Sequence, residues 1–218
     1  MAVGNDHEEA AKQLQSSVNK ITNWTKQWRI KLNETKSIHV NFTNKKKQHI
    51  PVNINNIPIP YADTAKYLGI TLDAKLRWKA HVKKKKEELD IKLKKMYWLI
   101  GRNSTLTIYN KILLYKQILK PVWTYGIQLW GCASKNNIEI IQRFQNKVLR
   151  TIVNAPWYCR NSDLHRDMEM DTVRQTIHNF ARRHEQRLLD HTNVEAIQLL
   201  DNANQVRRLK RTKPFELV

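Results

Sequence analysis

Residues 79–100 read KAHVKKKKEELDIKLKKMYWLI, and their pattern is the clearest indication of fold in the sequence. Its apolar side chains recur three, four or seven positions apart, at Val82, Leu89, Leu93, Met96 and Ile100. Because an α-helix turns once every 3.6 residues, this spacing places them on one side of a helix. Gly101 follows directly and is typical of a helix end. We therefore predict an amphipathic helix over 79–100 that packs its apolar stripe on a helical core.

The rest of this predicted helix is basic. Only three acidic residues interrupt the eight lysines between residues 79 and 95, which are Lys79, Lys83, Lys84, Lys85, Lys86, Lys92, Lys94 and Lys95. The chain has a formal net charge of +20, and its positive side chains repel one another unless a polyanion lies against them. The expected partner is therefore nucleic acid. About six phosphate contacts would lower affinity with salt at a log–log slope of about −4 to −5, without reading bases. A run of lysines is also common on a solvated helix, and this alternative stays open.

The distribution of charge indicates how the chain is divided. Residues 61–131 carry 15 basic and 5 acidic side chains, a net charge of +10, whereas the segments before and after carry +5 each. Lysine also gives way to arginine: 21 lysines and 3 arginines precede residue 132, and 4 lysines and 11 arginines follow it. This change predicts a domain or subdomain boundary near Gly131.

The first 74 residues mix helix and strand patterns. They predict a helix over 6–28 and a half-buried strand over 38–42, in which Ile38, Val40 and Phe42 alternate with polar residues. A hairpin is expected at 52–59, because its central dipeptide Asn55-Asn56 tolerates positive φ, and its prolines place it at a sheet edge. A further strand is predicted over 65–72.

Everything after Trp78 has a helical pattern. A second helix is expected from Ser104 or Thr105 to Pro121, mostly buried and stopped by the proline. Further amphipathic helices are predicted over 136–151, 170–191 and 193–200. Aromatic side chains interleave with the charge and could stack on bases, but their helical spacing favours core positions for most of Trp78, Tyr97, Trp98, Trp123, Tyr125 and Trp130.

Several classes of protein do not fit the composition. Cys132 and Cys159 lack C-x-x-C spacing, which argues against a disulfide scaffold or zinc ribbon and fits a reducing compartment. The histidines near Cys159 lack metal-ligand spacing. There is no secretory pattern and no stretch approaching the roughly 20 apolar residues that span a bilayer. We expect an intracellular protein without a membrane partner.

Longer motifs carry a family resemblance. The segment KILLYKQILKPVWTYG at 111–126, continuing to Trp130-Gly131, resembles the thumb region of reverse transcriptases from non-LTR retrotransposons. FQNKVLR at 144–150 and NAPWY at 154–158 resemble the same region.

The flanking motifs extend this resemblance. LNETKS at 32–37 resembles the last palm motif of these enzymes, and KYLGI at 66–70 resembles their primer-grip hairpin. LLDN at 199–202 and RRLKR at 207–211 match best the tails of jockey-like elements. These motifs follow one another in the same order as in the family and cover nearly the whole chain. The sequence therefore resembles the C-terminal part of a jockey-like reverse transcriptase.

The resemblance implies an α+β fold in three parts. Residues 1–74 would be the end of the palm, with a small antiparallel sheet and the primer-grip hairpin. Residues 75–131 would be a helical thumb, and 132–218 a helical C-terminal extension with a basic tail. The family's activity is RNA-directed DNA polymerisation, so the implied partners are an RNA template and a DNA primer, together with the missing remainder of the polymerase.

The resemblance also assigns site residues. Lys36 matches the lysine proposed to protonate the pyrophosphate leaving group, a role that needs a positioned ammonium. A plain surface lysine beside a turn is the alternative. Tyr67, Leu68 and Gly69 match the turn that steadies the primer end, where glycine permits close backbone approach.

The family's catalytic aspartates, which hold two Mg²⁺ ions, precede the segment that this chain resembles. Tyr61-Ala62-Asp63-Thr64 imitates a Y-A-D-D signature, but Thr64 stands where the second aspartate belongs, and we interpret it as a loop. We therefore expect no cofactor bound by this chain and no polymerisation by the chain alone.

Other readings of the sequence remain open. One is a non-enzymatic basic nucleic-acid-binding module, such as a domesticated remnant. Another is that Met1 comes from a gene model cut out of a longer reading frame. The basic run Lys83–Lys86 is compatible with nuclear import and equally with phosphate contacts, so nuclear or cytoplasmic residence is not decided.

Overall fold

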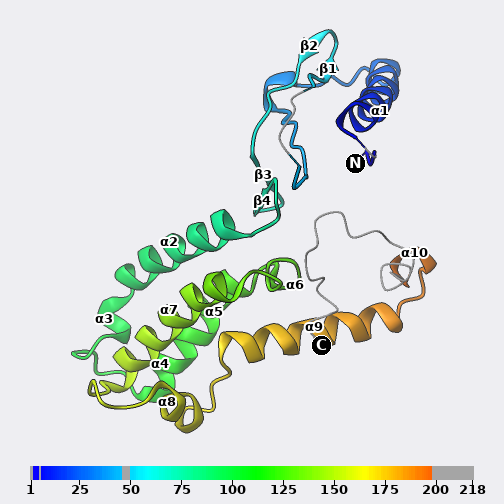
Figure 1. Ribbon diagram of the computed structural model, residues 1–218. Helices are drawn as coiled ribbons and strands as arrows, with labels where there is room; N and C mark the ends of the chain where they lie inside the picture. The colour runs from blue at the N-terminus through cyan, green and yellow to red at the C-terminus, as the bar shows by residue number, and fades with distance from the viewer. Residues whose placement is uncertain (1, 5, 46–49, 198–218) are drawn as a thin grey trace. The chain divides into compact units, whose positions relative to one another are not determined.

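The computed structural model describes all residues except 1, 5, 46–49 and 198–218 (Figure 1). The chain forms two compact units, Met1–Leu76 and a second unit that begins at Arg77. The described part is mostly helical, with two small antiparallel sheets of two strands each. An α+β fold is therefore confirmed, although the single small sheet that was expected is two separate hairpins.

The first unit is built on one helix and a hairpin. Helix α1, His7–Gln27, begins at Asp6, whose side chain accepts a hydrogen bond from the Glu9 N–H as a helix cap does. Strands β1, Asn53–Ile54, and β2, Ile57–Pro58, pair in the predicted hairpin, and Asn55 and Asn56 have the expected positive φ of 50° and 65°. The buried core of this unit consists of Val52, Ile54 and Ile59, packed against Leu14, Val18 and Leu32.

A side chain of α1 also holds β1 by polar contacts. The Gln15 amide donates to the Asn53 carbonyl at 2.9 Å and accepts from the Asn53 N–H at 2.8 Å. The C-terminal half of α1 is different, because Ile21, Trp24 and the capping residue Trp28 are apolar and exposed within this unit.

Two strand predictions in the first unit are wrong. Residues 38–42 form no strand but a single parallel bridge between His39 and Tyr61. The neighbouring Pro60 has no N–H, so a longer ladder cannot form there. His39 is buried and Ile38 exposed, the reverse of the expected alternation.

The segment predicted as one strand over 65–72 is a hairpin. Strands β3, Thr64–Tyr67, and β4, Ile70–Asp73, pair in antiparallel register with Tyr67 opposite Ile70. The chain reverses at Leu68 and Gly69, whose φ values are 45° and 75°. A two-residue turn of this kind matches the twist of its strands, which explains the hairpin.

The second unit begins with the lysine-rich helix. Helix α2, Lys79–Lys95, ends one turn earlier than predicted, and a separate turn, α3, Tyr97–Ile100, follows Met96. The whole predicted apolar stripe is buried, namely Val82, Leu89, Leu93, Met96 and Ile100. Helix α2 packs on α7 and α5 (Figure 1), and also on the π-helical turn η2; the bounds of these elements follow.

The second predicted helix continues through its proline. It consists of α4, Ile108–Leu114, the π-helical turn η2, Tyr115–Leu119, and α5, Lys120–Thr124. Proline crowds the carbonyl of the preceding turn in a regular helix, and the wider π turn relieves this contact, so Pro121 lies inside the helix rather than after it. The helix is also less buried than expected, because Ile108 and Ile118 are exposed.

The remaining helices close the core of the second unit. They are α6, Ile127–Trp130, α7, Lys135–Val153, α8, Asn161–Asp167, α9, Val173–Leu189, and α10, Val194–Ile197. Two predicted helices, 136–151 and 170–191, are confirmed as α7 and α9, whereas α8 was not predicted. Gly131 lies within this unit, since α6 packs on α9 across it. The basic tail at 207–211 and the end of the predicted helix 193–200 lie outside the described residues.

Candidate nucleic-acid interface

Six of the eight α2 lysines are exposed to solvent. We call this set the outer lysines: Lys79, Lys83, Lys84, Lys92, Lys94 and Lys95. Among the described residues, no carboxylate forms an ion pair with any of them. Helix α2 therefore presents a surface of unneutralised ammonium groups.

The other two lysines point into the unit. The Lys85 ammonium lies 3.0 Å from a Glu88 carboxylate oxygen and 5.7 Å from the centre of the Tyr125 ring, and its side chain is only 13% exposed. Lys86 pairs with Asp90 and lies 5.5 Å from the Phe144 ring centre. We call these two residues the inner lysines.

The eight lysines predicted to bind phosphate thus have two different environments, and that all eight bind it stays a prediction. The charges of the inner lysines already interact with carboxylates and aromatic faces, which stabilises a cation in a partly desolvated place. The spacing in the sequence already indicated that the inner and outer lysines differ. Lys85 and Lys86 follow Val82 by three and four positions and precede Leu89 by four and three, so they flank the buried stripe.

A buried histidine lies beside the inner lysines. His81 is 1% exposed, and its ring packs between Trp78 and Trp130 at centroid distances of 6.3 Å each. Burial lowers the pKa of His81 to about 4, with a further lowering by the charges of Lys85 and Lys84 and an opposing effect of Glu88. The side of α2 that faces the core therefore disfavours additional positive charge.

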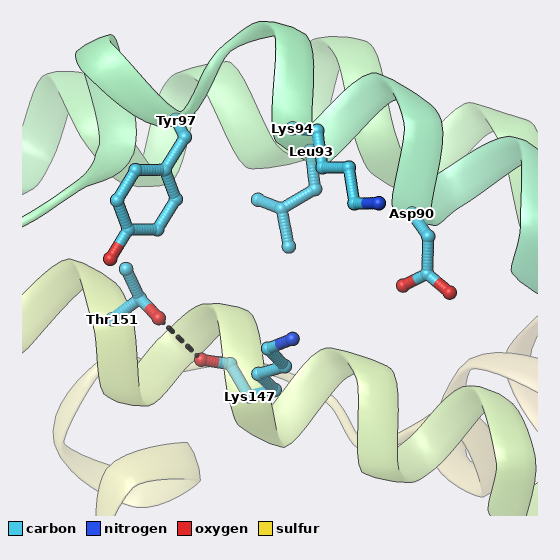
Figure 2. A pocket seen from close by; sticks show the side chains of 6 residues that line it. All are labelled: Asp90, Leu93, Lys94, Tyr97, Lys147 and Thr151. Atoms are coloured by element: carbon cyan, nitrogen blue, oxygen red, sulfur yellow. Dashed lines mark hydrogen bonds between the residues drawn. The ribbon is translucent and has the colours of Figure 1, made fainter.

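A groove runs between α2 and α7. It has a volume of about 400 Å³ and is lined by Asp90, Leu93, Lys94, Tyr97, Lys147 and Thr151 (Figure 2). Lys147 comes from α7 and is exposed, so a basic residue of a second helix adjoins the outer lysines. Thr151 does not offer a free hydroxyl donor, since it donates to the Lys147 carbonyl at 2.9 Å. The positive surface thus continues from α2 onto α7.

Lys36 lies in the first unit, at the end of the short helical turn η1, Glu34–Lys36. Its side chain is exposed, and its N–H donates to the Asn33 side chain at 3.0 Å. Asn55 anchors this turn by donating to Glu34 at 2.9 Å, which lowers the pKa of Glu34. The turn that carries Lys36 is therefore attached to the β1–β2 hairpin.

The proposed primer-grip residues occupy the tip of the β3–β4 hairpin. Tyr67 and Leu68 are both well exposed, and Gly69 takes the left-handed conformation that glycine tolerates best. The tip therefore exposes two large side chains to solvent, and at Gly69 another molecule can come close to the backbone.

Within the described ranges, no three or more His, Cys, Asp or Glu side chains are arranged to hold a metal ion. His165 is instead buried between α7 and α8, with its ring nitrogens 2.7 Å from the Met170 carbonyl and 2.9 Å from the Asn146 side chain. Among the described helices, none combines the length and apolarity that crossing a bilayer requires.

The aromatic residues divide into two groups. Trp78, Trp123 and Trp130 are buried, as predicted, whereas Tyr97, Trp98 and Tyr125 are exposed. The expectation that most of the six belong to the core is therefore only half right.

Comparison with known proteins places the chain in a family. It is 40% identical over 96% of its length to the "Probable RNA-directed DNA polymerase from transposon X-element" of Drosophila melanogaster. It is 37% identical over 93% of its length to a second protein of that species, named for transposon BS, and 34% identical over 94% to that of mobile element jockey. No protein-family model and no solved structure matches the chain.

These identities define the chain as a homologue of part of an RNA-directed DNA polymerase. These relatives are RNA-directed DNA polymerases of jockey-like non-LTR retrotransposons, and the chain matches only a fragment of them. The chain spans about a quarter of the length of the curated relatives, since it covers 22 to 24% of them.

Proposed function

We propose that the helical unit binds the backbone of an RNA template paired with its DNA primer, as part of an RNA-directed DNA polymerase. One observation carries this proposal, namely the six outer lysines of α2 that have no carboxylate partner among the described residues. Neighbouring Lys85 and Lys86 show that the same helix neutralises its lysines where they face protein. Among the described residues, the lysines of α2 thus lack carboxylate partners only on the side that faces solvent, which is the side a nucleic acid can reach.

The size of α2 suits this partner. Its 17 residues span about 25 Å, and a DNA duplex of that length carries about 15 phosphates. Six ammonium groups can therefore contact phosphates along one side of a duplex. An A-form helix has a deep, narrow major groove that side chains do not read, so recognition by backbone and shape is expected.

Salt dependence tests the proposal. Binding of a blunt RNA–DNA hybrid, followed by fluorescence anisotropy, should weaken between about 50 and 200 mM salt with a log–log slope of about −4 to −5. A slope near zero, or no binding at low salt, contradicts the proposal.

We further infer that this segment does not extend a primer by itself. The support is chemical: two-metal phosphoryl transfer needs convergent carboxylates, and the described residues provide no such cluster. Purified chain with a primed RNA template, magnesium and deoxynucleotides should give no product. Extension would contradict the inference, and binding that never assists a polymerase supplied in trans would favour a non-enzymatic module.

For the first unit we propose that Tyr67, Leu68 and Gly69 contact the primer end and that Lys36 acts as a general acid in the assembled polymerase. The exposed hairpin tip supports the first role, and exposure of Lys36 leaves the second role sterically open. In the assembled enzyme, Leu68→Asp should lower primer extension without changing the salt slope of hybrid binding. Unchanged extension contradicts the primer-grip role.

The exposed stripe Ile21, Trp24 and Trp28 on α1 suggests a protein partner. Contiguous exposed apolar side chains mark interaction surfaces, and about three quarters of the first relative's length lies outside the segment matched here. We propose the remainder of the polymerase as that partner. Addition of the remainder should reduce the acrylamide quenching of the total tryptophan fluorescence in wild type, and Trp24→Glu should weaken the association. If wild type and Trp24→Glu bind the remainder of the polymerase equally tightly, this proposal is contradicted.

A further inference from the structure

The loop between α7 and α8 displays two aromatic side chains that the fold does not use. Trp157 is 90% exposed and Tyr158 is 72% exposed, with ring centroids 5.9 Å apart and planes at 81°. Side chains this exposed bury almost no apolar area, so they contribute little to the stability of the unit. A large exposed aromatic pair therefore needs another explanation.

The loop is held in shape by one arginine. The Arg150 guanidinium donates to the Pro156 carbonyl at 3.0 Å, to the Cys159 carbonyl, and through Nε to the Asn161 side chain at 2.9 Å. The Cys159 N–H also donates to the Pro156 carbonyl at 3.1 Å, which closes a four-residue turn. Trp157 and Tyr158 are the two central residues of that turn, so they project from a fixed frame.

The surroundings of the pair indicate what it binds. Arg160 follows the turn directly, is exposed, and has no carboxylate partner among the described residues. The groove of Figure 2 includes Thr151, which lies on α7 six residues before Trp157, and Lys147 one turn further back. Along the chain, the pair thus follows the α7 residues that line the groove, and its cationic neighbour Arg160 favours a polyanion over an apolar protein surface.

We propose that Trp157 and Tyr158 form a stacking platform for unpaired bases of a single-stranded nucleic acid. Aromatic rings on a preorganised turn stack on any base, because every base has a π face, while nearby cations hold the backbone. This inference rests on the proposed function, since it assumes that the outer lysines hold the paired part of the same nucleic acid.

Three probes separate stacking from charge: a single-stranded oligouridylate, an abasic strand of equal length, and a blunt RNA–DNA hybrid. Wild type should bind oligouridylate more tightly than the abasic strand. The double variant Trp157→Ala/Tyr158→Ala should bind oligouridylate about tenfold more weakly or worse, with little change for the other two probes and an unchanged salt slope. Trp157→Phe/Tyr158→Phe, which keeps both rings, should retain most of the affinity.

A matched control removes two other exposed aromatics of the same unit, Trp98 and Tyr109, by substitution to alanine. The proposal is overturned if this control loses as much affinity for oligouridylate as the Trp157/Tyr158 variant. It is also overturned if wild type does not distinguish oligouridylate from the abasic strand. Failure of wild type to bind any probe with salt dependence would instead defeat the proposed function, and this inference with it.

Discussion

The outer lysines and the inner lysines of α2 are chemically identical and adjacent in sequence, yet they have different environments. Lys83 and Lys84 extend into solvent without carboxylate partners among the described residues, whereas Lys85 and Lys86 pair with Glu88 and Asp90 and lie near aromatic rings. The difference shows that the helical period turns only part of a run of charged residues toward solvent. Substitutions on the two sides of α2 should therefore have different effects.

The largest effect is expected at the inner apolar stripe. Leu89 is fully buried, so Leu89→Ala should lower the free energy of unfolding by about 2–5 kcal/mol, through lost transfer energy and a residual cavity. Urea denaturation measures this change. Glu87→Ala on the exposed side of the same helix is the matched control, expected within about 0.5 kcal/mol of wild type. Similar losses in both variants would mean that α2 has no distinct inner side.

The next effect is a pH dependence at His81. Its folded pKa of about 4 lies below the ordinary value of 6.5, so the unfolded chain takes up this proton first as pH falls. The stabilisation from neutral His81 is complete above pH 6.5 and is lost progressively down to about pH 4, by about 3 kcal/mol at most. The difference in unfolding free energy between wild type and His81→Gln isolates this residue, and it should shrink or reverse across that window. A constant difference would contradict the assignment.

A smaller difference in the free energy of unfolding is expected between variants of the two halves of the lysine run. Lys85→Ala/Lys86→Ala removes two ion pairs and two cation–π contacts, and it should be about 1–2 kcal/mol less stable than Lys83→Ala/Lys84→Ala. Helix propensity and lost charge are the same in both variants, so they cancel. Chemical denaturation of the two proteins side by side gives the answer, and equal stabilities would break the comparison.

Periodicity predicted the parts of the fold that depend on local pattern. The stripe from Val82 to Ile100 is buried as expected, and helices α1, α7 and α9 lie where their apolar spacing placed them. The hairpin at Asn55 was predictable, because the tolerance of that residue for positive φ is a property of its own side chain.

Features that depend on tertiary partners were not predictable in the same way. The π turn before Pro121 and the single bridge at His39 depend on how distant segments pack. The residue pattern did not predict the hairpin at Leu68, because leucine rarely adopts positive φ. The family resemblance of this segment did indicate a turn.

The candidate site shows the same division. That α2 is basic follows from the sequence, but the aromatic partners of Lys85 and Lys86, Tyr125 and Phe144, lie far along the chain. Trp157 is exposed on a turn that the Arg150 guanidinium holds in shape, and no local periodicity encodes this contact.

The most direct measurement compares the salt dependence of hybrid binding for Lys83→Ala/Lys84→Ala and Lys85→Ala/Lys86→Ala. Each lost phosphate contact should reduce the log–log slope by about 0.7–0.9, so the outer double variant should lose about 1.5 from a slope of about −4 to −5. The inner double variant should keep the wild-type slope. Equal reductions in the two variants, or a larger reduction in the inner one, would contradict the claim that only the lysines turned outward on α2 hold nucleic acid.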